Sequence, residues 1–201
     1  ESPAPLPDSQ YGELDRIRKK FSFLVGYVGS HGLANALYSF IEAANLMKDN
    51  RKVGFVLTGK GPEKENLQKK TEEMKLENVF FLDPVPKRAV PELLKRMDIL
   101  YIGLKDEPLF RFGISPNKLF DYMMAGKPVI QAINAGNDIV KEAGCGISIE
   151  PENPEQIKKA IENLISLFGV ERDELGKRGY RFVLRENIYS VLADKFINAV
   201  K

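Results

Sequence analysis

The sequence of 201 residues predicts an α/β fold with a doubly wound, mostly parallel sheet of about six strands flanked by helices. Short apolar runs alternate with amphipathic helical patterns along the chain, and this alternation is typical of a parallel sheet. Runs such as GFVL and ILYIGL are apolar throughout, which indicates strands that are buried on both faces. Together these observations favour helices on both sides of the sheet over a sandwich with one solvated face.

The elements follow in a regular order. A short helical pattern at residues 14–20 precedes a strand expected over residues 21–28, and apolar residues at helical spacing then run from Leu33 to Met47. The remaining strand and helix units are expected at KVGFVLT with residues 62–76, NVFFL with AVPELLKRM, DILYIGL with PNKLFDYMMAG, PVIQAI with NDIVKEAG, and GISIE with a helix from Pro154.

Three segments are expected along the chain: a leading segment of residues 1–20, a main α/β domain of residues 21–186 and a C-terminal helix of residues 187–201. The tail is helical by pattern, with breaks expected around Gly176, Gly179 and Asn187. The chain opens at Glu1 rather than Met and is rich in proline there, which suggests a piece of a longer protein.

The composition excludes several classes of protein. Hydrophobic and charged fractions of 43% and 29% argue against disorder, and a net charge of +2 without a long single-sign run offers no footprint for nucleic acid or an anionic membrane. The lone Cys145 excludes an internal disulfide framework and a structural zinc site. The sequence contains no transmembrane segment or signal peptide, so we expect a cytoplasmic protein.

The loop after the first expected strand, GYVGSHG, is the first candidate ligand site. Its residues Gly29, Ser30, His31 and Gly32 let the backbone approach a ligand and lead into a helix whose N-terminus attracts anions. The glycine spacing is not GxGxxG and the next strand lacks the acidic residue of a dinucleotide fold, which argues against NAD. His31, the only histidine, could donate to a phosphate or sugar oxygen; a solvated loop histidine is the alternative.

Two further loops are weaker candidates. In TGKGPE, Lys60 lies between glycines, but the segment lacks the GxxxxGK[ST] pattern of a phosphate-binding loop, and a tight turn explains the glycines equally well. In LDPVPKRAV, Val85 and the prolines around it could present backbone groups and flat surfaces to a nucleobase edge.

The segment FGISPNK is the richest candidate. Ser115 is expected to cap a helix whose first residue is Pro116, which leaves the N–H groups of Asn117 and Lys118 free to bind an anion. Lys118 adds a cation beside the positive end of the helix, a combination that suits a diphosphate. Gly113 and Ile114 precede this site, and the glycine allows close approach of the backbone.

Asp121 lies one helical turn beyond Asn117 and shares its face. A carboxylate at that depth could accept hydrogen bonds from both hydroxyls of a ribose. A solvated helix carboxylate is the alternative interpretation.

The motif SPNKLFDYMMAGKPVI, preceded by RFG and following DILYIGL, resembles the donor-binding core of retaining GT-B glycosyltransferases of the group four family, in the version found in bacterial capsule and O-antigen transferases. FLVGYVGSHG, FVLTGKGPE and NVFFLDPVP resemble further parts of the C-terminal domain of that family. The resemblance implies that residues 21–186 form the Rossmann-like, nucleotide-sugar-binding half of a GT-B fold. It also implies a UDP-sugar donor, with neither a cofactor nor a metal.

The resemblance further implies an N-terminal domain, absent from this chain, that binds a polysaccharide or lipid-linked acceptor. The helix of residues 187–201 would reach back toward that domain, and the isolated chain would bind donor without transferring sugar. The complete enzyme could attach peripherally to the inner face of the plasma membrane.

Two departures from the family pattern matter for the site. Asp121 takes the place of the second glutamate of the E-x7-E motif, which holds the ribose, but Phe110 or Arg111 falls where the first glutamate is expected. SHGLANAL replaces the usual arginine and lysine after the first strand, so Lys118, His31, Lys60 or Arg111 must stabilise the leaving diphosphate. Two alternatives stay open: a UDP-sugar 2-epimerase, which typically needs more carboxylates and histidines, and a noncatalytic nucleotide-binding or interaction module.

Overall fold

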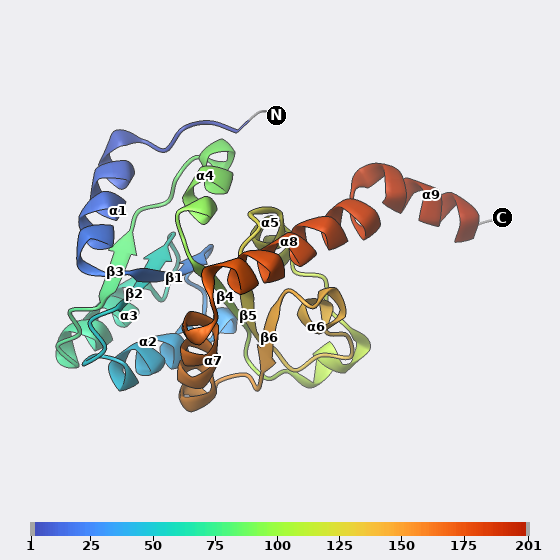
Figure 1. Cartoon of the computed structure of the whole chain (residues 1–201). Coiled ribbons are helices and arrows are strands. Elements are labelled where there is room, and N and C mark those ends of the chain that lie inside the picture. The colour runs from blue at the N-terminus through green and yellow to red at the C-terminus, as the bar shows by residue number, and fades with distance from the viewer. Residues whose placement is uncertain (1–2, 200–201) are drawn as a thin grey trace.

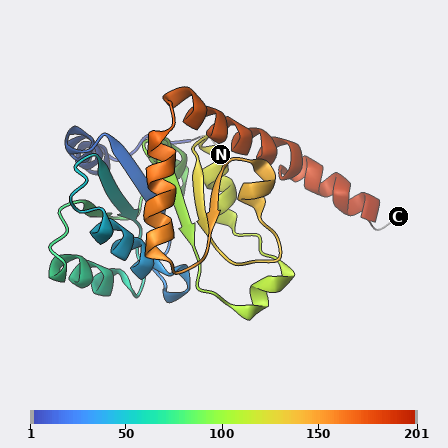
Figure 2. The same cartoon turned by 60° about the horizontal axis from the view of Figure 1, so that its bottom comes forward.

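A computed structural model describes residues 3–199 of the chain as a six-stranded parallel sheet with helices on both faces (Figures 1 and 2). The strand order is β3-β2-β1-β4-β5-β6, so the chain winds outward in one direction through β1 to β3 and in the other through β4 to β6. The strands are β1 (Phe23–Val28), β2 (Val53–Thr58), β3 (Val79–Leu82), β4 (Ile99–Gly103), β5 (Val129–Ala132) and β6 (Gly146–Ile149). The predicted doubly wound, Rossmann-like α/β fold is confirmed.

Two apolar layers hold the helices against the sheet. One face is covered by α2 (Leu37–Leu46), α3 (Lys64–Glu73) and α7 (Pro154–Ser166). The other face is covered by α1 (Asp8–Lys20), α4 (Val90–Lys95), α5 (Asn117–Met124), α6 (Ile139–Ala143) and α8 (Gly169–Glu186). The short 3-10 helices η1 (Leu33–Asn35), η2 (Lys87–Ala89) and η3 (Pro108–Phe112) lie in loops that follow β1, β3 and β4.

The sheet splits at its carboxyl edge between β1 and β4. β1 pairs with β2 along its whole length, to Val28 against Thr58, but with β4 only at Val25 and Gly26. Beyond Gly26 the hydroxyl of Tyr122 in α5 replaces β4 as the hydrogen-bond partner of β1. It accepts from the Val28 N–H at 2.8 Å and donates to the Val28 carbonyl at 2.9 Å. In doubly wound sheets this point of divergence is where ligands bind.

The start of α5 corrects one predicted signal. The helix begins at Asn117, with Pro116 in an extended conformation (ψ 118°) as the preceding residue. The prediction that Ser115 caps this helix and Pro116 opens it is wrong, because the extended Pro116 supplies the first acceptor, to Leu119 N–H at 3.0 Å. Gly126 follows the helix with φ 68°, as expected of a C-terminal glycine.

Helix α8 also differs from the expectation. It continues through Gly176 and Gly179, where breaks were predicted, because these glycines permit close packing rather than a turn. A Cβ on Gly176 would lie 1.9 Å from the carbonyl oxygen of Gly126, and one on Gly179 would lie 3.0 Å from Cβ of Cys145. The expected break at Asn187 is confirmed, and α9 (Tyr189–Ala199) extends beyond it, away from the sheet (Figure 1).

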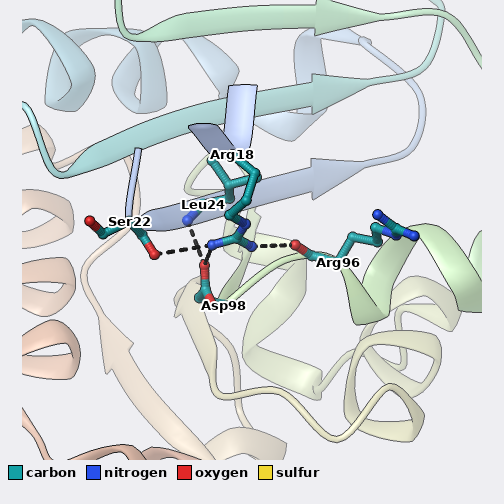
Figure 3. Close-up of polar contacts among 5 residues, drawn as sticks. All are labelled: Arg18, Ser22, Leu24, Arg96 and Asp98. Atoms are coloured by element: carbon teal, nitrogen blue, oxygen red, sulfur yellow. Dashed lines mark hydrogen bonds and ion pairs between the residues drawn. The ribbon is translucent and has the colours of Figure 1, made fainter. Parts of the chain in front are cut away.

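Helix α1 is fastened at the amino edge of the sheet, opposite the split (Figure 3). Its Leu14 and Ile17 are buried in the core. The Asp98 carboxylate accepts from the Leu24 N–H at 2.7 Å and from Arg18 Nη1 at 2.5 Å. Arg18 also donates to the carbonyls of Ser22 (3.1 Å) and Arg96 (2.6 Å), so the leading segment contributes a fixed helix to the packed domain.

We expect Asp98→Ala to lower the free energy of unfolding by about 2 kcal/mol and Tm by about 4 to 8 °C, because it leaves the Leu24 N–H and the Arg18 guanidinium without their shared acceptor. Thermal unfolding followed by circular dichroism measures the effect. Asp15→Ala is the control, since it removes an ion pair to Arg96 between partly exposed side chains, worth less than about 1 kcal/mol. Equal effects of the two variants would contradict the role assigned to Asp98.

Candidate functional site

A cavity of about 510 Å³ lies at the carboxyl edge of the sheet, between the loops that follow β1, β2 and β3. Its walls are mainly apolar side chains and glycine backbone, a surface suited to a flat ring with backbone groups at its rim. The lining residues are Val28, Gly29, Ser30, Thr58, Gly59, Lys60, Gly61, Pro84, Val85 and Val90.

Glycines allow the loops after β1 and β2 to touch. The Gly29 N–H donates to the Thr58 carbonyl at 3.0 Å, and the His31 N–H donates to the Lys60 carbonyl at 2.9 Å. A Cβ on Gly59 would lie only 1.9 Å from the carbonyl oxygen of Gly29. The TGKG segment is therefore more than a tight turn: its glycines make room for the loop that carries Gly29 and His31.

Lys118 reaches from α5 over the end of β1, beside this cavity. Its ammonium donates to the Tyr27 hydroxyl at 2.8 Å and to Asn35 Oδ1 at 2.7 Å, and lies 4.6 Å from the centre of the Tyr27 ring. Its Nζ lies 3.2 Å from where a Cβ on Gly29 would be, so it directly adjoins the cavity wall. Among the residues that the structure describes, no carboxylate forms an ion pair with Lys118, and burial lowers its pKa to about 8. The site therefore presents a cation with no counter-charge among the described residues.

His31 lies beneath the same loops and is fully buried. Its ring packs between Tyr27 and Phe81, with ring centres 6.0 and 6.1 Å away. Within the described part of the chain neither ring nitrogen has a hydrogen-bond partner. Burial, with the charges of Lys64 and Lys118, lowers its pKa to about 4, so the imidazole is neutral near pH 7. In this arrangement the backbone of His31 organises the loop, while its side chain lies inside rather than on the cavity wall.

The segment before α5 forms a separate hollow. Arg111, Gly113, Ile114 and Ser115 line it together with Asn137, and the Arg111 guanidinium lies over the exposed ring of Phe112. The side-chain amide of Asn137 holds this segment through two hydrogen bonds to the backbone of Ile114, of 2.8 and 2.9 Å. Gly113 has φ 96°, a conformation that favours glycine.

Asn117 and Asp121 lie on an exposed face of α5. The pKa of Asp121 is raised by partial desolvation, an effect that Lys87 in η2 opposes. A carboxylate so placed is accessible to a ligand hydroxyl, and Lys87 helps to keep it ionised.

The structure thus divides the predicted site residues into groups. Gly29, Ser30, Lys60 and Val85 line the first cavity, Lys118 adjoins it, and Gly32 lies further along the same loop. Gly113, Ile114, Ser115 and Arg111 line the second hollow, and Asn117 and Asp121 lie on the exposed face of α5.

Sequence reasoning did not single out Tyr27 and Asn35, the two partners of Lys118. Tyr27 belongs to an apolar strand pattern that predicts only core. Asn35 follows the glycine loop without a recognisable motif, so no signal in the sequence distinguished either residue.

Among the described residues, no group of three or more histidine, cysteine, aspartate or glutamate side chains could hold a metal ion. None of the described helices is both long enough and apolar enough to cross a membrane.

Comparison with known proteins identifies the family. Residues 22–166 match the family described as "Glycosyl transferases group 1". The chain belongs to this family. The Bacillus subtilis (strain 168) protein named "Putative teichuronic acid biosynthesis glycosyltransferase TuaH" is 25% identical over 178 residues, which cover 88% of this chain and 42% of that protein. This group 1 glycosyltransferase chain therefore spans less than half the length of this curated relative.

Solved structures agree on the fold of this glycosyltransferase domain. HepE from Anabaena, in complex with UDP-glucose, superimposes with a TM-score of 0.76 at 17% identity, covering 96% of this chain and 51% of HepE. The C-terminal domain of LpcC, a group 1 family glycosyltransferase from Francisella tularensis, gives a TM-score of 0.70 at 21% identity, covering 94% of this chain and 96% of that domain. The predicted GT-B glycosyltransferase C-terminal domain is confirmed at the level of family and fold.

Proposed function

We propose that this domain binds the UDP-sugar donor of a retaining, metal-independent glycosyltransferase that extends a bacterial polysaccharide of the capsule or O-antigen type. The observation that carries the proposal is the desolvated Lys118 ammonium, which has no counter-charge among the described residues and lies beside an apolar cavity at the carboxyl edge of the sheet. A nucleoside diphosphate matches this pairing of an apolar surface with an unpaired cation.

The parts of the donor can be assigned to parts of the site. The apolar cavity, with Pro84 and Val85, takes the base, and the exposed Asp121 takes the ribose diol. Lys118 and the free N–H groups of the first turn of α5 take the diphosphate, with Lys60 at the cavity wall as a second cation. The hollow formed by Arg111, Gly113 and Ser115 takes the sugar.

As the leaving group departs, negative charge develops on the diphosphate, and Lys118 is placed to stabilise it. UDP-glucose bound to HepE and the teichuronic acid role in the name of TuaH support the donor class and the pathway class.

The acceptor half of the enzyme belongs to the proposal as well. Exposed apolar side chains on α9, including Leu192 and Phe196, provide a surface for a second domain that binds a polysaccharide or lipid-linked acceptor. The proposed reaction takes place in the cytoplasm, with peripheral attachment to the inner face of the plasma membrane as a feature of the complete enzyme.

Thermal unfolding of the chain with UDP, UDP-N-acetylglucosamine, uridine, ADP, GDP and NAD tests the donor class. A ligand at about 100 times its Kd adds about 2.7 kcal/mol, which raises Tm by about 5 to 10 °C. We expect UDP and UDP-sugars to produce this rise, uridine a smaller one, and ADP, GDP and NAD little. A rise in Tm with ADP or NAD but not with UDP would overturn the assignment of the donor. An unchanged Tm with every nucleotide would favour an interaction module.

A further inference from the structure

We infer that Asn35 and Tyr27 are positioning residues that hold the Lys118 ammonium for the donor diphosphate, and that the neutrality of Asn35 keeps this charge available to the ligand. The inference rests on the proposed function, since it concerns how the diphosphate is held. Neither residue is among the site residues that the sequence predicts.

The geometry around Lys118 supports the positioning role. Its ammonium has three N–H donors, of which the Tyr27 hydroxyl (2.8 Å) and Asn35 Oδ1 (2.7 Å) accept two. Gly29 leaves room for the ammonium on the cavity side. One donor therefore remains for a ligand, and the other two fix where the charge lies.

The same two partners are held by one backbone oxygen of the glycine loop. The Ser30 carbonyl accepts from the Tyr27 hydroxyl at 2.6 Å and from Asn35 Nδ2 at 3.0 Å. These bonds orient the amide so that Nδ2 faces Ser30 and Oδ1 faces Lys118. The hydroxyl proton of Tyr27 is likewise directed to Ser30, which leaves its oxygen lone pair for Lys118. Loop, strand and helix thus form one network that ends on the ammonium.

Charge explains why an amide rather than a carboxylate suits position 35. Burial raises the pKa of Tyr27 above its ordinary value, and the pKa of His31 is about 4, so both are neutral near pH 7. Lys64 on α3 lies at this edge and is paired with the Asp83 carboxylate at 2.8 Å, and Asp121 lies on the exposed face of α5. In the described part of the chain, the groups in direct contact with the ammonium are therefore neutral, and its positive charge is not cancelled by the residues that position it.

Asn35→Asp is the sharpest test, because it preserves the acceptor for Lys118 and the size of the side chain while adding a counter-charge. It also removes the Nδ2 donor to the Ser30 carbonyl, and the pH profile separates that loss from the effect of the added charge. We expect the affinity for UDP near pH 7 to fall about tenfold or more, and the affinity for uridine to change less than about twofold, both by isothermal titration calorimetry. Asn163→Asp, on an exposed position of α7, makes the same chemical change away from the site and should change neither.

The pH profile separates positioning from a merely structural role. In the unaltered protein the UDP affinity should fall as pH rises through about 8, where Lys118 loses its proton. A carboxylate at position 35 favours the ammonium, so in Asn35→Asp the fall should move to higher pH. A change that merely loosened the loop would weaken UDP and uridine binding together and would not move the profile.

Tyr27→Phe provides a second, independent variant if Asn35→Asp does not fold. It keeps the ring over which Lys118 lies and removes one acceptor, so UDP affinity should fall about three- to tenfold while uridine affinity is kept. If the unaltered protein binds UDP no better than uridine, the proposed function itself fails. If it does bind UDP better, but both variants bind UDP as tightly as the unaltered protein, or lose uridine equally, the positioning inference is overturned.

Discussion

Lys118→Met is expected to weaken UDP binding by about 10- to 100-fold while leaving uridine binding nearly unchanged, because a charge-assisted hydrogen bond contributes about 1.5 to 3 kcal/mol. The protein should remain as stable as before, to within about 1 kcal/mol. Methionine fills a similar volume, and its burial removes the desolvation cost that lowers the pKa of Lys118 to about 8. Isothermal titration with the two ligands, together with thermal unfolding, measures both effects.

The pH dependence has a definite sign. Diphosphate favours the ammonium form of Lys118, so UDP affinity should decrease as pH rises through about 8, and Lys118→Met should remove that decrease. Lys95→Met is the control, since Lys95 is an exposed lysine in the last turn of α4. An unchanged ratio of UDP to uridine affinity in Lys118→Met would show that other groups bind the diphosphate.

The fold could be predicted from local patterns because each strand of a doubly wound sheet is a short apolar run between helices. ILYIG of β4 is buried at every position, as its composition indicates. The wrong prediction of a break in α8 has a physical cause. The sequence around Gly176 predicts a helix break. In the structure the helix continues, and because glycine has no Cβ, α8 packs directly against the carbonyl of Gly126, 50 positions earlier. Whether a glycine breaks a helix or permits close packing depends here on a contact between distant segments, which the local sequence does not show.

The same limit applies to the candidate site. The carboxyl ends of parallel strands meet at one edge, so the loops with Gly29, Lys60 and Val85 could be placed around one cavity in advance. The partners of Lys118 could not, because Tyr27 and Asn35 precede it by 91 and 83 positions. His31 showed the chemistry of a ligand contact in a glycine loop, and only the closure of the neighbouring loop over it reveals that its ring is buried.

The second large effect is expected from Gly59→Ala, which should lower the free energy of unfolding by about 2 to 4 kcal/mol, lower Tm by about 5 to 15 °C and abolish detectable UDP binding. Gly59 has φ 149°, and its added Cβ would meet the backbone oxygen of Gly29 at 1.9 Å and His31 Nε2 at 3.3 Å. Because the obstacle is backbone, no rotamer change relieves it, and the loops after β1 and β2 must separate. Both loops line the cavity, so stability and binding are lost together.

Gly12→Ala is the matched control for this prediction, with the opposite sign. Gly12 lies inside α1 on an exposed face, and an added Cβ would meet nothing within 4 Å. Alanine there should raise stability by about 0.5 to 1 kcal/mol, since glycine loses more conformational freedom in a helix, and leave UDP binding unchanged. Thermal unfolding and UDP titration of both variants measure these effects on stability and binding. If Gly59→Ala were as stable as the unaltered protein and still bound UDP, the contact between the two loops would not shape the donor site.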